Sequence, residues 1–186
     1  MLDSRHILRQ QLRKRRQALG KGSQLAAANN LVSAVVRLGH YARAKNIACY
    51  LASDGELDCR FVIEQLWRDG KQCFLPIVTS KDGAPYLEFK PYRPGQSLMK
   101  NRYGILEPCG GRCLSAQVLD MVLVPLVGFD YQGNRLGMGG GYYDRSFAFS
   151  CQTGKPLLFG VAHRCQRVPQ LQAQPWDVPM QGILAV

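Results

Sequence analysis

One segment groups several residue types that together can bind phosphate and a divalent cation. It reads Arg135-Leu-Gly137-Met-Gly139-Gly140-Gly141-Tyr142-Tyr143-Asp144-Arg145. Glycines bring backbone N–H groups close to a ligand, and a helix that begins just after them adds its positive end. The two flanking arginines can pair with phosphate oxygens, and Asp144 offers magnesium a hard oxygen ligand. The segment therefore predicts a phosphate and magnesium site, and a flexible loop with packed tyrosines is the alternative.

Neither of the two common nucleotide-binding motifs matches this segment. A Walker A loop ends in Gly-Lys followed by Ser or Thr, which this run lacks. The dinucleotide fingerprint requires a glycine spacing other than Gly137-x-Gly139-x-Gly141, and an acidic residue at the ribose position is missing as well. The glycines alone thus leave the identity of the ligand open.

A second basic feature lies near the N-terminus. On a helical wheel, four arginines fall within roughly 80° of arc, and leucines occupy the neighbouring arc. The arginines are Arg5, Arg9, Arg13 and Arg16. Two interpretations stay open for this stripe: a solvated charged face and a nucleic-acid-binding patch.

Composition narrows the class of protein. Lys and Arg number 24 against 13 Asp and Glu, and the net charge of +11 indicates an anionic partner, either nucleic acid or a small phosphate- or carboxylate-rich ligand. The seven cysteines contain no Cys-x-x-Cys pair, and with three histidines they are too sparse to predict a zinc site. An odd cysteine count, no signal peptide and no apolar run of about 20 residues favour a cytoplasmic protein that does not enter the membrane.

Helical and strand-like segments alternate along the chain. Helices are expected over 4–19, 23–38, 58–68 and 142–149, with Ser23 and Asp58 as N-caps. Strands are expected over 46–51, 72–78, 86–90, 121–124, 156–162 and 182–186. The pattern predicts a single α/β domain over 1–186, a three-layer sandwich with a largely parallel central sheet and helices on both faces. Ligands of such folds bind beyond the carboxyl ends of the strands, so the loop after Val124 is the expected site.

The full string Arg-x-Gly-x-Gly-x-Gly-Tyr-Tyr-Asp, after an apolar strand and Pro125, resembles the 5-formyltetrahydrofolate cyclo-ligase family, also called methenyltetrahydrofolate synthetases. The resemblance covers nearly the whole chain and suggests a bacterial member. Arg5-His-Ile-Leu-Arg9 looks like the family's N-terminal phosphate-binding element, although lysine is usual at the first position. The resemblance implies ATP-binding by Arg5, Arg9, Arg135, Gly137, Met138, Gly139, Gly140, Gly141, Tyr142 and Tyr143.

The resemblance also implies the folate and metal contacts. Leu51, Glu56, Tyr142 and Tyr143 would bind the folate, Asp144 and Asp177 would share Mg²⁺, and Arg135 and Tyr143 would be catalytic. From the residues alone, Glu56 is a loop carboxylate and Asp177 can cap a turn before Pro179. Many members have a second acidic residue where this chain has Met180-Gln181. Glu107 also lies in a family-like element, where it either faces the pocket or ends a strand.

The reaction that the resemblance implies converts 5-formyltetrahydrofolate and ATP to 5,10-methenyltetrahydrofolate, ADP and phosphate. A formamide carbonyl is a poor electrophile with a poor leaving group, and phosphorylation of its oxygen corrects both faults. The expected partners are these small molecules, with the folate polyglutamated in some cases, and the expected state is a monomer. A basic nucleic-acid-binding module is the alternative, and a phosphosugar isomerase-like or CoA-transferase-like enzyme is a weaker one.

Overall fold

The computed structural model describes residues 4–101 and 104–186. Its centre is a six-stranded sheet in the order β10-β9-β6-β1-β2-β3. These strands are β1 (Asn46–Ala48), β2 (Gln72–Lys81), β3 (Ala84–Tyr92), β6 (Met121–Pro125), β9 (Leu157–Ala162) and β10 (Gly182–Ala185). Every neighbouring pair is parallel except β2 and β3, which form an antiparallel hairpin. The expected largely parallel sheet is therefore confirmed.

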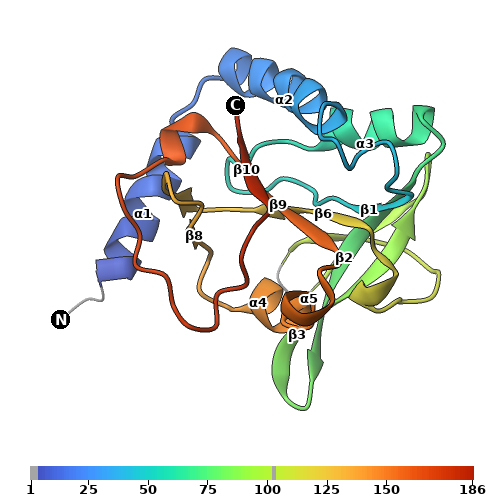
Figure 1. Ribbon diagram of the computed structural model, residues 1–186. Coiled ribbons are helices and arrows are strands. Elements are labelled where there is room, and N and C mark those ends of the chain that lie inside the picture. The colour runs from blue at the N-terminus through green and yellow to red at the C-terminus, as the bar shows by residue number, and fades with distance from the viewer. Residues whose placement is uncertain (1–3, 102–103) are drawn as a thin grey trace.

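Helices cover both faces of the sheet (Figure 1). The helices α2 (Lys21–Val36) and α3 (Arg60–Arg68) pack on one face through buried residues such as Leu31 and Leu66. The short helices α4 (Tyr142–Phe147) and α5 (Ser150–Thr153) lie against the other face, together with the single-turn helix η1 (Ala116–Val118). Since β6 is buried on both sides from Met121 to Val124, its continuous apolar run correctly predicted an interior strand.

The N-terminal helix α1 (Ser4–Gln17) stands at one edge of this layered core (Figure 1). Leu12 is fully buried and packs in a third apolar cluster with Val127 and Leu136. Leu136 belongs to a two-stranded ribbon formed by β7 (Gly128–Phe129) and β8 (Arg135–Leu136), which the chain forms directly after β6. The leucine arc of α1 therefore fixes the helix beside the loop that carries the glycine run.

Several local expectations were wrong. Ser23 does not cap α2, which begins at Lys21 after Gly20 and has no side-chain cap. Helix α3 begins at Arg60 rather than at Asp58, whose Oδ1 instead accepts a hydrogen bond of 2.8 Å from the Arg60 N–H. The segment 142–149 forms two short helices rather than one.

The sequence patterns also missed a small hairpin. Strands β4 (Leu98–Lys100) and β5 (Leu106–Pro108) pair as a separate two-stranded sheet. The η2 turn (Arg164–Gln166) follows β9 and was not expected either. Across residues 4–101 and 104–186, no helix is both long enough and apolar enough to span a membrane.

Candidate active site

A cavity of about 860 Å³ opens at the carboxyl ends of β1 and β6. The chain runs from β1 to β2 on one side and later adds β6 on the other side of β1, so strand order reverses between β1 and β6. Open α/β sheets bind ligands at such reversal points. The loop after β1 and the residues Val124 to Val127 both line the cavity, as expected from the sequence. A volume of this size suits a nucleotide or a folate-sized molecule.

The glycine run forms one wall of this cavity. Gly137 to Asp144 all line it, including Met138, Tyr142 and Tyr143. Arg9 lies against this wall, because its Nε donates a hydrogen bond of 2.9 Å to the Gly137 carbonyl. Gly139 has a φ of 96°, and a Cβ at that position would lie 3.3 Å from the Arg9 guanidinium carbon. Glycine is therefore required where α1 and the loop approach each other.

Arg145 has a different role from the one expected. It is not among the residues that line the cavity. Its Nε donates to the Pro85 carbonyl at 2.9 Å, and its Nη2 donates to the Gly140 carbonyl. Arg145 thus supports the glycine run from behind, on the β3 side, instead of facing a phosphate.

The two predicted metal ligands lie at one end of the cavity. Asp144 Oδ1 accepts hydrogen bonds from Arg135 and from the Val178 N–H, the latter at 3.1 Å, so it lies next to the segment that carries Asp177. Asp177 Oδ2 accepts from the Gln174 N–H at 2.9 Å. Within the described part of the chain, each carboxylate keeps a second oxygen without a hydrogen bond, and both side chains line the cavity.

This donor set fits magnesium rather than a metal held wholly by protein. No cluster of three or more His, Cys, Asp or Glu side chains suited to a metal occurs among residues 4–101 and 104–186. Mg²⁺ is commonly held by one or two carboxylates together with substrate phosphates and water. Two aspartates beside a glycine run meet that requirement. Gln181, where many relatives were expected to have an acid, instead accepts a hydrogen bond from the Leu158 N–H through its side chain.

Arg135 is buried behind these carboxylates. Its side chain is 7% exposed, and its guanidinium donates to Asp144 Oδ1 and to the Val178 carbonyl. The residue therefore joins the glycine run to the C-terminal segment and orients the Asp144 carboxylate. This geometry favours a positioning contribution from Arg135 alongside its positive charge.

The opposite wall is formed by the loop after β1. Leu51 and Glu56 line the cavity there, as does Tyr143. Burial raises the pKa of the Glu56 carboxyl, and a Ser53 N–H hydrogen bond of 3.1 Å opposes the rise. Burial also raises the pKa of the Tyr143 hydroxyl, and the negative charge of Glu56 adds to the effect. The tyrosine thus stays protonated at neutral pH and can donate a hydrogen bond to a ligand.

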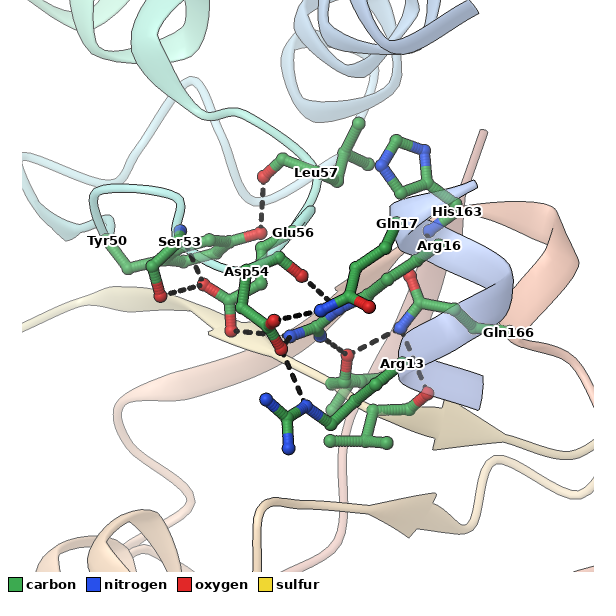
Figure 2. A network of polar contacts seen from close by, with 12 residues as sticks. Arg13, Arg16, Gln17, Tyr50, Ser53, Asp54, Glu56, Leu57, His163 and Gln166 are labelled. Carbon is green, nitrogen blue, oxygen red and sulfur yellow. Dashed lines mark hydrogen bonds and ion pairs between the residues drawn. The ribbon is translucent and has the colours of Figure 1, made fainter. Parts of the chain in front are cut away.

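The arginine stripe of α1 faces this cavity. Arg5, Arg9, Arg13 and Arg16 all line the cavity. Arg16 is 1% exposed, and with Arg13 it binds Asp54 in the loop after β1 (Figure 2). The contacts to a phosphate ligand that the family resemblance implies for Arg5 and Arg9 fit the place of this stripe against the glycine run.

Sequence reasoning assigned no role to two polar residues that support the site. Asp54 was not assigned a function, although an Asp-Gly pair directly after a strand signals a tight turn. Gln166 is 1% exposed and its Nε2 donates to the Leu126 carbonyl at 2.6 Å and to the Val127 carbonyl at 3.0 Å. Both carbonyls belong to the loop after β6, so Gln166 fixes the start of the segment that leads to the glycine run.

Glu107 does not line the cavity. Its Oε1 accepts hydrogen bonds from the Val78 N–H at 3.0 Å and from Asn101 Nδ2 at 2.7 Å. The carboxylate ties the β4–β5 hairpin to β2. Glu107 is the middle residue of β5, so both expectations for it were wrong: it neither faces the cavity nor ends a strand.

The fold and the cavity together define an α/β enzyme that binds a phosphate-bearing ligand at the strand reversal point. A family model described as the 5-formyltetrahydrofolate cyclo-ligase family matches residues 2–186. A 5-formyltetrahydrofolate cyclo-ligase of Haemophilus influenzae is 37% identical over 182 residues, which cover 97% of this chain and 96% of the relative. One from Escherichia coli K12 is 38% identical over 175 residues, covering 93% and 95%.

Solved structures agree with these sequence matches. The NMR structure of Aquifex aeolicus 5,10-methenyltetrahydrofolate synthetase has a TM-score of 0.81 at 27% identity and covers 97% of this chain and 89% of its own. The synthetase from Mycoplasma pneumoniae has a TM-score of 0.76 at 26% identity, with coverage of 97% and 98%. The chain therefore belongs to the 5-formyltetrahydrofolate cyclo-ligase family. Its activity is that of an ATP-dependent ligase of folate one-carbon metabolism, which converts 5-formyltetrahydrofolate to 5,10-methenyltetrahydrofolate.

Proposed function

We propose that the described cavity is the active site, in which ATP and 5-formyltetrahydrofolate react with Mg²⁺ bound between Asp144 and Asp177. One observation carries this assignment: a single cavity joins the glycine run, both aspartates and the Glu56 loop. These parts are far apart in sequence and meet where the strand order reverses. The ATP phosphates would bind along Gly137 to Gly141, with Arg5 and Arg9 of α1 on the same side.

The folate would occupy the end of the cavity nearer the loop after β1. Leu51 offers it an apolar contact, and Glu56 offers a carboxylate to the hydrogen-bond donors of its ring. Tyr142 and Tyr143 lie between this end and the glycine run, where their rings can pack against the substrate. One face of the Tyr143 ring already stacks on Phe147, with centroids 6.1 Å apart, which holds the ring in place.

The chemistry requires positioning more than a protein nucleophile. The formyl oxygen attacks the γ-phosphorus of ATP, the bond to the bridging oxygen of ADP breaks, and ADP leaves. N10 of the folate then attacks the activated formyl carbon and closes the ring. Loss of phosphate, which takes the former formyl oxygen with it, and of the N10 proton gives the methenyl product. The protein has to align the reactants and stabilise negative charge.

Each charged group has a defined part in this arrangement. Bound Mg²⁺ would neutralise phosphate charge and help to orient the γ-phosphoryl group. Arg9 lies against the glycine run, where the ATP phosphates would bind, and Arg135 holds the Asp144 carboxylate toward the cavity. The Tyr143 hydroxyl, kept protonated by burial, would donate a hydrogen bond to the folate.

The test is a spectrophotometric assay of methenyltetrahydrofolate formation with the purified chain. Product should form only when both ATP and Mg²⁺ are present, and ADP and phosphate should appear in equal amounts. Asp144→Asn should lower kcat by a factor on the order of 100, because the metal contact and the Arg135 ion pair are both lost. Asp82→Asn, in the exposed β2–β3 turn at a φ of 51°, is the control and should keep full activity. Full activity of Asp144→Asn would refute the metal assignment.

We further propose a cytoplasmic monomer that forms one domain over 1–186. All seven cysteines are free thiols, which suits a reducing compartment. A sedimentation experiment at micromolar concentration would check the monomer, and a dimer would contradict it.

A further inference from the structure

One buried arginine lies between two carboxylates at the edge of the cavity. Arg16 Nη2 is 2.8 Å from Asp54 Oδ2 and 3.7 Å from Glu56 Oε1, and only the first distance is a hydrogen bond (Figure 2). Arg16 Nε donates to the Asp54 carbonyl at 2.9 Å, and Nη1 donates to the Leu126 carbonyl at 3.2 Å. The hydrogen bonds of the guanidinium therefore go to Asp54 and to the backbone, and Glu56 is a more distant neighbour that accepts none of them.

We propose that Asp54 is a positioning residue that occupies the Arg16 guanidinium and so leaves the Glu56 carboxylate available to the folate substrate. The proposal rests on the assignment of Glu56 to substrate binding. Asp54 itself lines the cavity, but its proposed effect acts through Arg16, because it decides which carboxylate the buried cation binds. Two negative groups compete for one positive group, and the loop geometry favours Asp54.

The backbone around Asp54 fixes this choice. Asp54 and Gly55 both have positive φ, 53° and 74°, so the turn folds back on α1. A Cβ on Gly55 would lie 3.2 Å from Gln17 Cα and 3.3 Å from the Arg16 carbonyl oxygen, so the turn is in close contact with the helix backbone. Asp54 also accepts hydrogen bonds from Arg13 Nε at 2.7 Å and from the Gln17 side chain. The carboxylate is thus held at the helix by three side chains.

Among the described residues, Glu56 keeps one carboxylate oxygen without a hydrogen bond, and that oxygen lies 3.7 Å from Arg16 Nη2. Its Oε2 accepts from the Ser53 N–H at 3.1 Å, whereas Oε1 makes no hydrogen bond within residues 4–101 and 104–186. If the charge of Asp54 were removed, Arg16 would be buried without its main counterion, which is strongly unfavourable. The Glu56 side chain is the nearest remaining carboxylate and would turn toward Arg16. The folate would then lose its contact to Glu56.

The charges around Glu56 set the direction of a pH effect. It faces Arg13 and Arg16 of α1, Asp54 of its own loop, and the hydroxyls of Tyr50 and Tyr143. Besides the dominant effect of burial, Arg16 lowers the pKa of Glu56 and Asp54 raises it. Loss of the Asp54 charge, with Arg16 moved onto Glu56, therefore lowers that pKa.

The experiment compares the steady-state kinetics of Asp54→Asn with those of the wild-type chain. Asparagine suits the positive φ at this position, so the turn is preserved. The KM for 5-formyltetrahydrofolate should rise tenfold to a hundredfold, roughly the cost of misplacing one substrate contact, while the KM for ATP stays unchanged. The acid limb of the kcat/KM profile for the folate should also move to lower pH. Asp58→Asn, in the same loop but paired with the exposed Arg60, is the matched control and should leave both constants unchanged.

Two further variants separate the possible failures. Glu56→Gln should raise the folate KM by itself, and adding Asp54→Asn to it should cause no further rise. An unchanged folate KM in Glu56→Gln overturns the substrate assignment of Glu56 and the inference with it. If Glu56→Gln raises the folate KM strongly but Asp54→Asn leaves it unchanged, the inference alone is overturned. The same holds if the effects of the two substitutions on the folate KM are fully additive in the double variant.

A different result is expected if the ion pairs between α1 and Asp54 only hold the loop in place. Arg13→Gln removes the 2.7 Å ion pair between α1 and Asp54 but leaves Arg16 bound to Asp54. Its folate KM should rise much less than that of Asp54→Asn, and an equal rise would contradict the proposal. If Asp54→Asn melts below the assay temperature, Asp54→Gly removes the same charge at a position whose φ favours glycine, and its expected kinetics are the same.

Discussion

The arginines of this basic chain differ in what they do, and the difference follows from burial. Arg16 and Arg135 are 1% and 7% exposed at their side chains, and each is paired with an aspartate. Burying a guanidinium without a counterion would be strongly unfavourable, so each of these two arginines stays paired with its aspartate. Arg9 instead reaches the glycine run from α1. A net charge of +11 therefore says less about the ligand than the position of each arginine does.

Asp54 should make the free energy of unfolding depend on pH over a defined range. Its hydrogen bond from Arg13, followed by those from Arg16 and Gln17, lowers the pKa of Asp54 to about 2. An unfolded aspartate has a pKa of about 3.9, so the folded state binds the proton more weakly. Asp54 then contributes about 2 kcal/mol of stability above pH 4, and this contribution is lost as the pH falls from about 4 toward 2.

The measurement is the free energy of unfolding of wild type and Asp54→Asn between pH 7 and pH 2. At neutral pH the variant should be about 2 kcal/mol less stable, because an amide cannot replace the ion pairs. Toward pH 2 the difference should shrink, since the wild-type carboxyl also becomes protonated. A gap that stays constant over this range would show that the ion pairs do not stabilise the fold.

At the scale of elements, the contact between α1 and the glycine run should position the cavity wall that we assign to the ATP phosphates. Gly139→Ala places a Cβ 3.3 Å from the Arg9 guanidinium at a φ of 96° that alanine disfavours. Arg9 should be displaced, and the KM for ATP should rise by about tenfold, in keeping with a misplaced substrate contact. Gly95→Ala also has a positive φ, 72°, but open space around it, so it controls for backbone strain. Equal effects on the ATP KM in both variants would exclude the contact with Arg9 as the cause.

The elements that were predicted correctly are those whose pattern is long and locally determined. The buried run of β6 could be identified from neighbouring residues alone. The glycine run was also found from its composition, and its place beyond the strand ends followed from the parallel sheet. Even so, Ser23 was a wrong cap because α2 begins two residues earlier.

The parts that were missed depend on distant contacts. The strands of the β4–β5 and β7–β8 pairs have two or three residues each, too short for a periodic signal. Arg16 meets Asp54 across 38 positions, and Gln166 meets Leu126 across 40. A helical wheel could place four arginines on one face, but only the tertiary fold decides which of them is buried and which reaches the ligand.

For the molecule as a whole, the site joins three distant stretches of chain, and ligand binding should stabilise their common fold. The α1 helix, the glycine run and the segment at Asp177 all line one cavity, so MgATP would contact each of them. A ligand at a hundred times its Kd stabilises the native state by about 2.7 kcal/mol. For a chain of this length that corresponds to a rise in Tm of about 5–10 °C, which differential scanning calorimetry can measure.

ATP with EDTA should give a smaller rise, because the contacts through Asp144 and Asp177 require the metal. In Asp144→Asn the difference between the two conditions should disappear, whereas Asp82→Asn should retain it. If the wild-type chain showed no metal-dependent rise while turning over ATP, the cation would have to bind the nucleotide without help from either aspartate.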